Sequence, residues 1–269
     1  MGTIFRYSAI DTADRCLHKY KRVYIEGYED QDSGDKLFGT ALHAGIEALF
    51  TGGNGQEVFS LFWDSVKGSK APFGRYDWST LRDTGIKFIA RFERLHLKRF
   101  EPFMLEYEMF GKVGRHNVKG TADYIGLYRG VPSIVDWKTS AREYVPEKIL
   151  VAEQMPLYAE LVKQCLQYEV KQIVYYVFCK SEVRIQTLVL PITQEWLQQK
   201  IKNIELKCDD LAERKVFPKN PNSCMMGTFK CPLFAECHGE DVENEQLGET
   251  KTDSATSDSV GINLEELSR

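Results

Sequence analysis

The sequence lacks several features that would place it in other classes of protein. No stretch approaches the roughly 18 consecutive apolar residues that a transmembrane helix needs, and there is no internal repeat. The first residues contain no apolar segment followed by a cleavage site, so we expect no secretory signal. These absences predict a protein of the reducing cytoplasm, where the seven cysteines would not form structural disulfides.

Charge is unevenly distributed along the chain. The net charge of −4 by itself argues against a nucleic-acid-binding protein. Residues 240–269, however, contain nine acidic and two basic residues and carry −7, which leaves 33 basic and 30 acidic residues, or +3, for the rest. That balance is compatible with a local phosphate-binding groove. The tail is poor in aromatic residues and rich in Ser, Thr, Asp and Glu, so we predict that it is disordered.

Hydrophobic periodicity predicts several helices, then strands, then an alternation of both. We expect helices at 9–25, from Ser33 or Asp35 to 50, and at 56–67, 78–98, 151–167 and 193–214. Strands are expected at 104–110, 118–128, 133–137, 173–179 and 183–190. This order predicts an α/β fold with a mixed sheet packed between helices. We divide the chain into a helical N-terminal region (1–100), an α/β core (101–215), a cysteine-rich segment (216–239) and the acidic tail (240–269).

Two acidic residues and a lysine lie on consecutive predicted strands. Asp136 and Lys138 are two residues apart and share a face of their strand, while Trp137 points to the opposite face. If this strand pairs with the preceding one, Asp123 approaches Asp136, and two neighbouring carboxylates favour a divalent cation between them. Lys138 beside that cation can position or deprotonate a water molecule and offset phosphate charge, as metal-assisted phosphodiester hydrolysis requires. An Asp-x-Lys pair alone is more often part of a solvated strand face, so the surrounding motifs decide whether it has a functional role.

Four short motifs follow one another in a fixed order. They are Gly39-Thr40-Ala41-Leu42-His43 on a predicted helix, Gly120-Thr121-Ala122-Asp123 and Asp136-Trp137-Lys138 on predicted strands, and Gln154-Met155-Pro156-Leu157-Tyr158 on the following helix. Each is weak alone, but together they resemble the PD-(D/E)XK nuclease superfamily, in its RecB/AddB branch. That branch includes the iron–sulfur nucleases of CRISPR adaptation and many phage exonucleases. The resemblance covers about residues 8–239 and implies a restriction-endonuclease-like mixed sheet flanked by helices, with 101–215 as the nuclease core.

The resemblance implies a role for each motif residue. His43 and the carboxylates of Asp123 and Asp136, together with the backbone carbonyl of Trp137, would bind Mg²⁺ or Mn²⁺, which suit hard oxygen ligands and one imidazole. Lys138 would act on the attacking water.

The last motif would hold either the site or the DNA backbone. Gln154 and Tyr158 are four residues apart and so share one helix face. Pro156 between them departs from helix preferences, because proline is poorly tolerated in a helix interior. It fits if the helix begins near Glu153, which places Pro156 in the first turn, or if the helix is kinked.

Simpler interpretations exist for some of these residues. His43 lies on an apolar helix face and could be an ordinary core histidine, and Tyr158 could serve only packing. Glu106 or Glu108, on the preceding strand, could add an acidic contact to the site, although a solvated strand face is the simpler interpretation for both.

Four cysteines form a separate set. Cys224, Cys231 and Cys237 follow a C-x6-C-x5-C spacing, and Cys16 lies on the first predicted helix. The iron–sulfur members of the branch hold a 4Fe–4S cluster with one N-terminal cysteine and a C-terminal trio, so the resemblance implies the same ligand set here. The family's first gap is usually C-x2-C, which is shorter. Structural zinc held by four thiolates and unligated cysteines therefore stay as alternatives.

The resemblance implies a DNA exonuclease that acts on ends or single strands in recombination, repair or phage DNA metabolism, within a bacterial, archaeal or phage-infected cell. A CRISPR-adaptation-type nuclease that trims new spacers would share every motif. A DNA-binding module that no longer cuts is the third alternative, although it would not need the set Asp123, Asp136 and Lys138. The sequence has no Walker A motif, so unwinding would require a separate helicase or recombination protein.

Overall fold

The structure is a computed structural model that describes residues 3–29, 32–69, 71–226 and 229–239. It contains two compact units, Met1–Pro232 and Leu233–Arg269. The described part of the second unit contains the short helix α9, Phe234–His238. The tail predicted to be disordered, 240–269, lies outside the described residues. The division of the chain into four regions stays a prediction.

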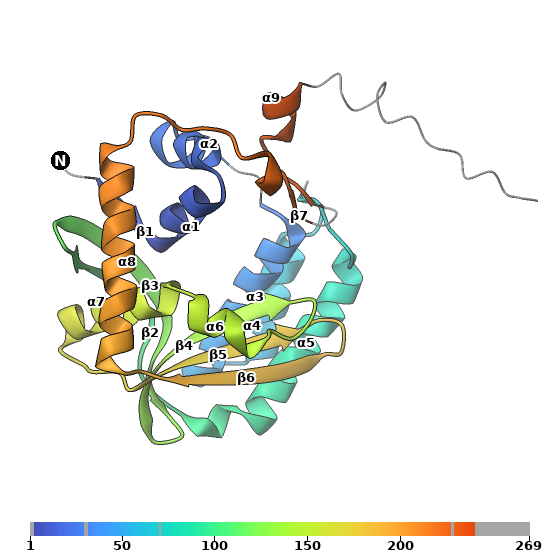
Figure 1. The fold of residues 1–269 in the computed structure, drawn as a ribbon. Helices are drawn as coiled ribbons and strands as arrows, with labels where there is room; N and C mark the ends of the chain where they lie inside the picture. Colours follow the sequence, from blue (N-terminus) through green and yellow to red (C-terminus); the bar gives the residue numbers. More distant parts are fainter. Residues whose placement is uncertain (1–2, 30–31, 70, 227–228, 240–269) are drawn as a thin grey trace, which may run out of the picture. The chain divides into compact units, whose positions relative to one another are not determined.

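A six-stranded mixed sheet forms the centre of the first unit (Figure 1). Its strands are β1 (Ile4–Arg6), β2 (Phe100–Val113), β3 (His116–Tyr128), β4 (Val131–Ser140), β5 (Gln172–Cys179) and β6 (Arg184–Pro191). The order is β1-β3-β4-β5-β6. β1 and β4 pair with different stretches of one edge of β3, and β2 pairs with its other edge. β1 is parallel to β3 and β4 to β5, whereas the other neighbours are antiparallel. A short hairpin, β7 (Met225–Met226) and β8 (Phe229–Lys230), lies near the end of the unit.

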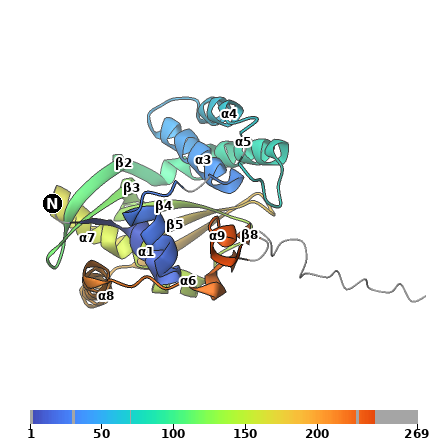
Figure 2. The ribbon, with the colours of Figure 1, turned by 90° about the horizontal axis from the view of Figure 1, so that it is seen from above.

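Helices cover both faces of the sheet (Figure 2). The helices are α1 (Tyr7–Arg15), α2 (Leu17–Tyr20), α3 (Gly34–Phe50), α4 (Gly55–Ser65), α5 (Trp78–Leu95), α6 (Pro146–Val151), α7 (Gln154–Leu166) and α8 (Gln194–Glu213), with short π- or 3-10 turns at Lys21–Ile25, Leu97–Arg99 and Pro221–Ser223. One hydrophobic core joins α1, α7 and α8 to one face, and a second, largely aromatic core joins α3, α4 and α5 to the other. This mixed sheet between helices confirms the predicted α/β fold.

Local sequence explains where the long helices begin. Ser33, Asn54, Asp77 and Thr193 each precede a helix, and each side chain accepts a hydrogen bond from the backbone N–H three residues later. Such caps satisfy donors that the first helical turn leaves unpaired. The predicted helix at 151–167 begins instead at Gln154, so Pro156 lies in the first turn, where proline is tolerated.

The predicted helix at 9–25 is wrong in one respect, because it is interrupted at Cys16. Cys16 is extended, with φ −157° and ψ 111°, so α1 ends before it and α2 starts after it. The carbonyl of Arg15 at this break accepts hydrogen bonds from Asn220 Nδ2 and Ser223 Oγ, both at 2.7 Å. A segment more than 200 residues away in sequence therefore stabilises the interruption. Strand β1 and helix α6 were not predicted either.

Strand β3 has an open stretch on one edge. β1 pairs with it up to Lys119, and β4 pairs on the same edge only from Tyr124 onward. Gly120–Asp123, the stretch between these two pairings, faces neither strand on that side. Among the described helices, none is both long and apolar enough to cross a membrane.

Candidate active site

The two aspartates meet where β3 and β4 separate. The last residues of these antiparallel strands that pair are Tyr124 and Val135. Asp123 and Asp136 are the next residues on each strand, and they lie just beyond the paired region. The backbone N–H of Trp137 donates a hydrogen bond of 2.8 Å to Asp123 Oδ2, which fixes this carboxylate against β4. The strands therefore diverge around the carboxylates, and side chains from helices on both faces can enter the space.

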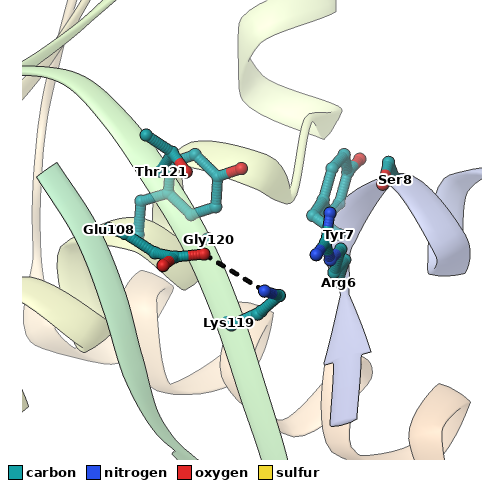
Figure 3. A pocket seen from close by; sticks show the side chains of 8 residues that line it. Arg6, Tyr7, Ser8, Glu108, Lys119, Gly120 and Thr121 are labelled. Carbon is teal, nitrogen blue, oxygen red and sulfur yellow. Dashed lines mark hydrogen bonds and ion pairs between the residues drawn. The ribbon is translucent and has the colours of Figure 1, made fainter. Parts of the chain in front are cut away.

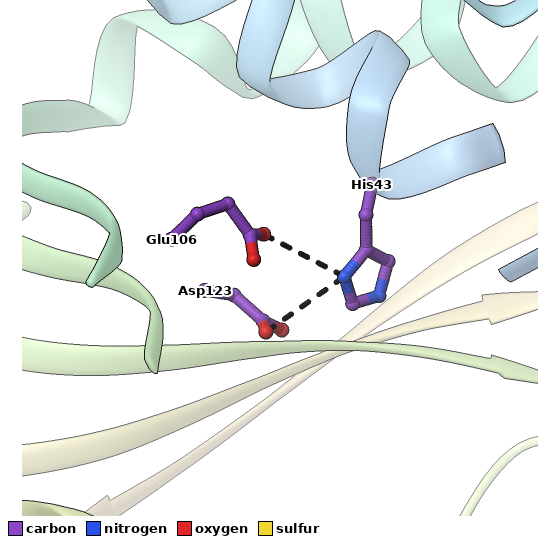
Figure 4. Close-up of side chains that lie close together, drawn as sticks. All are labelled: His43, Glu106 and Asp123. Carbon is purple, nitrogen blue, oxygen red and sulfur yellow. Dashed lines mark ion pairs between the residues drawn. The ribbon is translucent and has the colours of Figure 1, made fainter. Parts of the chain in front are cut away.

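Helix α3 contributes His43 from one face (Figure 4). Its Nε2 lies 2.8 Å from the carbonyl oxygen of Trp137, so this nitrogen carries the proton in that contact. Its Nδ1 lies 3.7 Å from Asp123 Oδ1 and 3.8 Å from Glu106 Oε1. His43 is thus a member of the acidic cluster and not a residue of the apolar core.

Glu106 enters the cluster through an unusual backbone conformation. Its φ is +43°, in the left-handed region that non-glycine residues rarely adopt. It lies on β2 between Leu105 and Tyr107, which pair with the residues flanking Asp123. His43, Glu106 and Asp123 each offer a ligand atom, and these atoms lie within 4.8 Å of one another. Backbone strain of this kind often accompanies functional sites.

Electrostatics show that this cluster attracts positive charge. Burial would lower the pKa of His43, but Glu106 and the charges of Asp123 and Asp136 outweigh it and raise this pKa to about 9. Burial, only partly opposed by the positive charge of His43, raises the pKa of Asp123 to about 7. Closely spaced carboxylates hold a proton at neutral pH under these conditions, and a divalent cation can replace it.

Lys138 occupies the other side of the carboxylates. Its Nζ donates to Asp136 Oδ1 at 2.9 Å and to Gln154 Oε1 at 3.1 Å. Burial would lower the pKa of Lys138, but the charges of Asp136 and Asp123 raise it above its ordinary value, so the side chain remains an ammonium group. Gln154 in turn donates to the hydroxyl of Tyr158 at 3.4 Å, one turn later on α7.

Gly120 explains how Tyr158 reaches this position. A Cβ at residue 120 would lie 2.9 Å from Cδ1 and Cζ of the Tyr158 ring and closer still to Cε1. The ring therefore packs directly against the β3 backbone, where it is almost fully buried. Gly120 of one motif and Tyr158 of another therefore contact each other directly.

The donor set fits a hard divalent cation. Asp136 is 3% exposed, and its Oδ2 atom has no hydrogen-bond partner among the described residues. Leaving a buried carboxylate oxygen unpaired is costly, so such atoms usually have a ligand. Carboxylates of Asp123, Asp136 and Glu106, one imidazole and the Trp137 carbonyl are suitable donors for Mg²⁺ or Mn²⁺.

The structure thus brings together the predicted residues from four separate elements: His43, Asp123, Asp136, Trp137, Lys138, Gln154 and Tyr158. Sequence reasoning considered Glu106 but favoured a solvated strand face. Glu106 and Glu108 look equivalent in sequence. In the structure Glu106 has a positive φ and lies beside Asp123, whereas Glu108 pairs with Lys119. The catalytic roles of these residues stay predictions.

Three of the four predicted cluster cysteines lie near one another in the first unit. Burial raises the pKa of the Cys224 thiol, and the nearby thiols of Cys231 and Cys16 raise it further. The backbone N–H of Cys231 donates to the carbonyl of Cys224 at 2.8 Å. Cys237 belongs to the second unit, so the complete four-cysteine set stays a prediction.

Comparisons with known proteins agree with this geometry. The model of the PD-(D/E)XK nuclease superfamily matches residues 5–238. A protein of Eubacterium rectale to which exonuclease activity is ascribed has a similar fold, with a TM-score of 0.55 and 16% identity over 82% of this chain and 85% of that one.

Two further solved structures are much less similar. SSO0001 has a TM-score of 0.29 at 13% identity, over 76% of this chain and 87% of that one. Rai1 of Scheffersomyces stipitis has a TM-score of 0.23 at 11% identity, over 74% and 66%. Both scores are too low to bear on the fold. No curated protein matches the sequence significantly.

Proposed function

Because the chain belongs to the PD-(D/E)XK nuclease superfamily, we propose that it is a metal-dependent DNA exonuclease acting on ends or single strands. The observation that carries this proposal is the convergence of Asp123, Asp136 and Lys138 with His43 in one space between the separating strands. The exonuclease activity ascribed to the similar Eubacterium rectale protein supports it. Recombination, repair or phage DNA metabolism is the proposed setting, with strand separation supplied by another protein.

Five groups would hold the cation: the three carboxylates of Asp123, Asp136 and Glu106, the His43 imidazole and the Trp137 carbonyl. A bound Mg²⁺ or Mn²⁺ supplies Lewis-acid stabilisation of the phosphate and lowers the pKa of a bound water. Glu106 extends the ligand set that the family resemblance implied.

The neighbouring side chains set up the rest of the reaction. As an ammonium group, Lys138 donates to a water or a phosphate oxygen and stabilises the negative charge that develops as the bond breaks. Gln154 holds the Lys138 ammonium in place, and Tyr158 holds Gln154. The hydrogen bond to Asp136 Oδ1 keeps the Lys138 ammonium beside the carboxylates that would hold the cation.

A decisive test uses single- and double-stranded DNA labelled at the 5′ or the 3′ end, with Mg²⁺, Mn²⁺ or EDTA. We expect cleavage by the parent protein, and a loss of at least about a hundredfold in Asp136→Asn and Lys138→Met, the order expected for lost charge stabilisation. Asp83→Asn and Lys163→Met, which change exposed residues of the same types, are the matched controls. Cleavage that survives both site substitutions would refute the mechanism, and DNA binding without cleavage would identify a non-cutting module. The labelled end defines polarity.

We also propose a 4Fe–4S cluster held by Cys16, Cys224, Cys231 and Cys237. The proximity of the first three thiols supports it. Such a cluster would join the interrupted first helix to the C-terminal segment and act structurally. Anaerobically purified protein should contain four iron atoms per chain and show the visible absorbance of the cluster, and Cys224→Ser should lose both. Stoichiometric zinc without this absorbance would exclude the cluster.

A further inference from the structure

A small pocket lies at the far end of the open stretch of β3, where β1 ends (Figure 3). Its volume is about 160 Å³. Two cationic side chains line it: Arg6, the last residue of β1, and Lys119, its register partner on β3. Four residues that carry hydroxyl groups also line it, together with Glu108 and Gly120: Tyr7, Ser8, Thr121 and Tyr158. Guanidinium, ammonium and hydroxyl groups are the donors that proteins present to phosphate oxygens.

The balance of charge in the pocket is positive. Lys119 pairs with Glu108, which also lines the pocket, at 3.1 Å. The Arg6 side chain is exposed, and no hydrogen bond or ion pair joins it to any residue that the structure describes. Its guanidinium donors are therefore available to an anion, and one positive charge remains after Glu108 and Lys119 cancel.

The pocket is close to the candidate cation site on the same strand. Lys119, Thr121 and Asp123 alternate along β3 and share a face. The rise of a strand places Lys119 about 13 Å from Asp123. That distance corresponds to about four nucleotides of a B-form strand, or fewer of a stretched single strand. Tyr158 belongs to both places, since its ring lines the pocket and its hydroxyl bonds to Gln154.

An exposed aromatic ring lies beside the pocket. Phe110 is the register partner of Lys119 on β2 and is 54% exposed. The Lys119 ammonium lies 5.3 Å from the centre of this ring. An aromatic face next to cationic side chains is the combination with which proteins bind single-stranded nucleic acid, because bases stack on the ring while the cations contact the backbone.

We propose that the pocket binds a phosphate group of DNA, a few nucleotides from the bond that is cut, with Arg6 as its main contact. This inference rests on the proposed nuclease function. The phosphate is either an internal phosphodiester or the terminal phosphate of a strand. In both cases the bound phosphate sets which linkage reaches Asp123 and Asp136.

Binding without cleavage tests the pocket directly. Fluorescently labelled single strands are titrated with Lys138→Met protein and with the same protein carrying Arg6→Gln. We expect Arg6→Gln to weaken binding about tenfold. The slope of log K against log salt concentration should become shallower by about 0.7, because one phosphate contact is lost. Arg6→Lys should restore part of the affinity. Arg94→Gln, which removes an exposed arginine on α5, is the matched control and should change affinity by less than twofold.

Three versions of one strand identify the phosphate: 5′-phosphate, 5′-hydroxyl and 3′-phosphate. A loss of affinity equal for all three supports an internal phosphodiester, and a loss confined to one phosphorylated end supports a terminal phosphate. An Arg6→Gln effect no larger than that of Arg94→Gln on every strand overturns the proposal, as does a parent protein that binds no DNA.

Cleavage kinetics separate this inference from the proposed function. In a protein with Lys138 intact, Arg6→Gln should raise KM about tenfold and leave kcat within twofold, because the contact is present in both the bound and the transition state. Cleavage with an unchanged KM would refute the pocket alone. Arg6-dependent binding by a protein that never cleaves would refute the nuclease function and keep the pocket.

Discussion

Replacing Gly120 by alanine tests the contact on which the positions of Gln154 and Lys138 depend. The added Cβ would lie 2.9 Å or less from three atoms of the Tyr158 ring, closer than real Cβ atoms approach. Either the ring or the β3 backbone must shift. Overpacking of this kind costs about 1–3 kcal/mol of unfolding free energy. Displacement of the ring would also withdraw the Tyr158 hydroxyl from Gln154.

Gly39→Ala is the matched control. At residue 39 a Cβ would meet only Thr139 Oγ1, at 3.8 Å, an ordinary contact. Gly39 lies inside α3, where alanine is favoured over glycine by up to about 1 kcal/mol. Gly39→Ala should therefore raise the free energy of unfolding and Gly120→Ala should lower it, as measured by urea unfolding monitored by tryptophan fluorescence.

A double-mutant cycle identifies the cause. Tyr158→Ala alone should destabilise the protein by about 3–5 kcal/mol, because it removes a buried ring. In that background Gly120→Ala should cost less than about 0.5 kcal/mol, since the clash is gone. If Gly120→Ala is equally costly with and without the Tyr158 ring, the steric explanation is wrong.

Three further predictions concern the cation and pH. Glu106→Gln should weaken Mn²⁺ binding about tenfold, measured by calorimetry, and an unchanged affinity would remove Glu106 from the ligand set. Mn²⁺ affinity should rise between pH 6 and 9 with release of protons, because the pKa of Asp123 is about 7 and that of His43 about 9; a pH-independent affinity would contradict this. Burial and nearby arginines lower the pKa of His96 to about 4, from 6.5 in the unfolded chain, so the neutral ring stabilises the fold above pH 6.5 and this stability is lost as pH falls towards 4. The full shift would be worth about 3 kcal/mol, which partial exposure reduces to about 1 kcal/mol. His96→Asn should reduce the change in the urea midpoint between pH 7 and pH 5. An equal change in both proteins would exclude His96 as the cause.

Periodic segments with local start signals could be predicted from the sequence. The helix starts predicted near residues 33 and 193 agree with the observed caps at Ser33 and Thr193. The alternation of Asp136, Trp137 and Lys138 correctly separates the two faces of β4. Pro156 also fits the first turn of α7. These outcomes depend on neighbours within a few residues, which a sequence displays directly.

Features that depend on distant residues could not be predicted. β1 is three residues long and exists because it pairs with β3, more than 110 residues later. The break at Cys16 is stabilised by Asn220 and Ser223. Glu106 joins the site opposite Asp123 with its backbone at a positive φ. No local pattern carries this information.

Trp137 connects the aromatic core to the chemistry of the site. Its indole is 3% exposed and lies within 6.3 Å, between ring centres, of Phe50, Phe92 and Tyr176. Its own backbone N–H and carbonyl hold the Asp123 carboxylate and the His43 imidazole. If the proposed site cleaves DNA, substitutions deep in that core should therefore change the cleavage rate without touching a reacting atom. Replacing these rings to raise heat resistance would then also change activity.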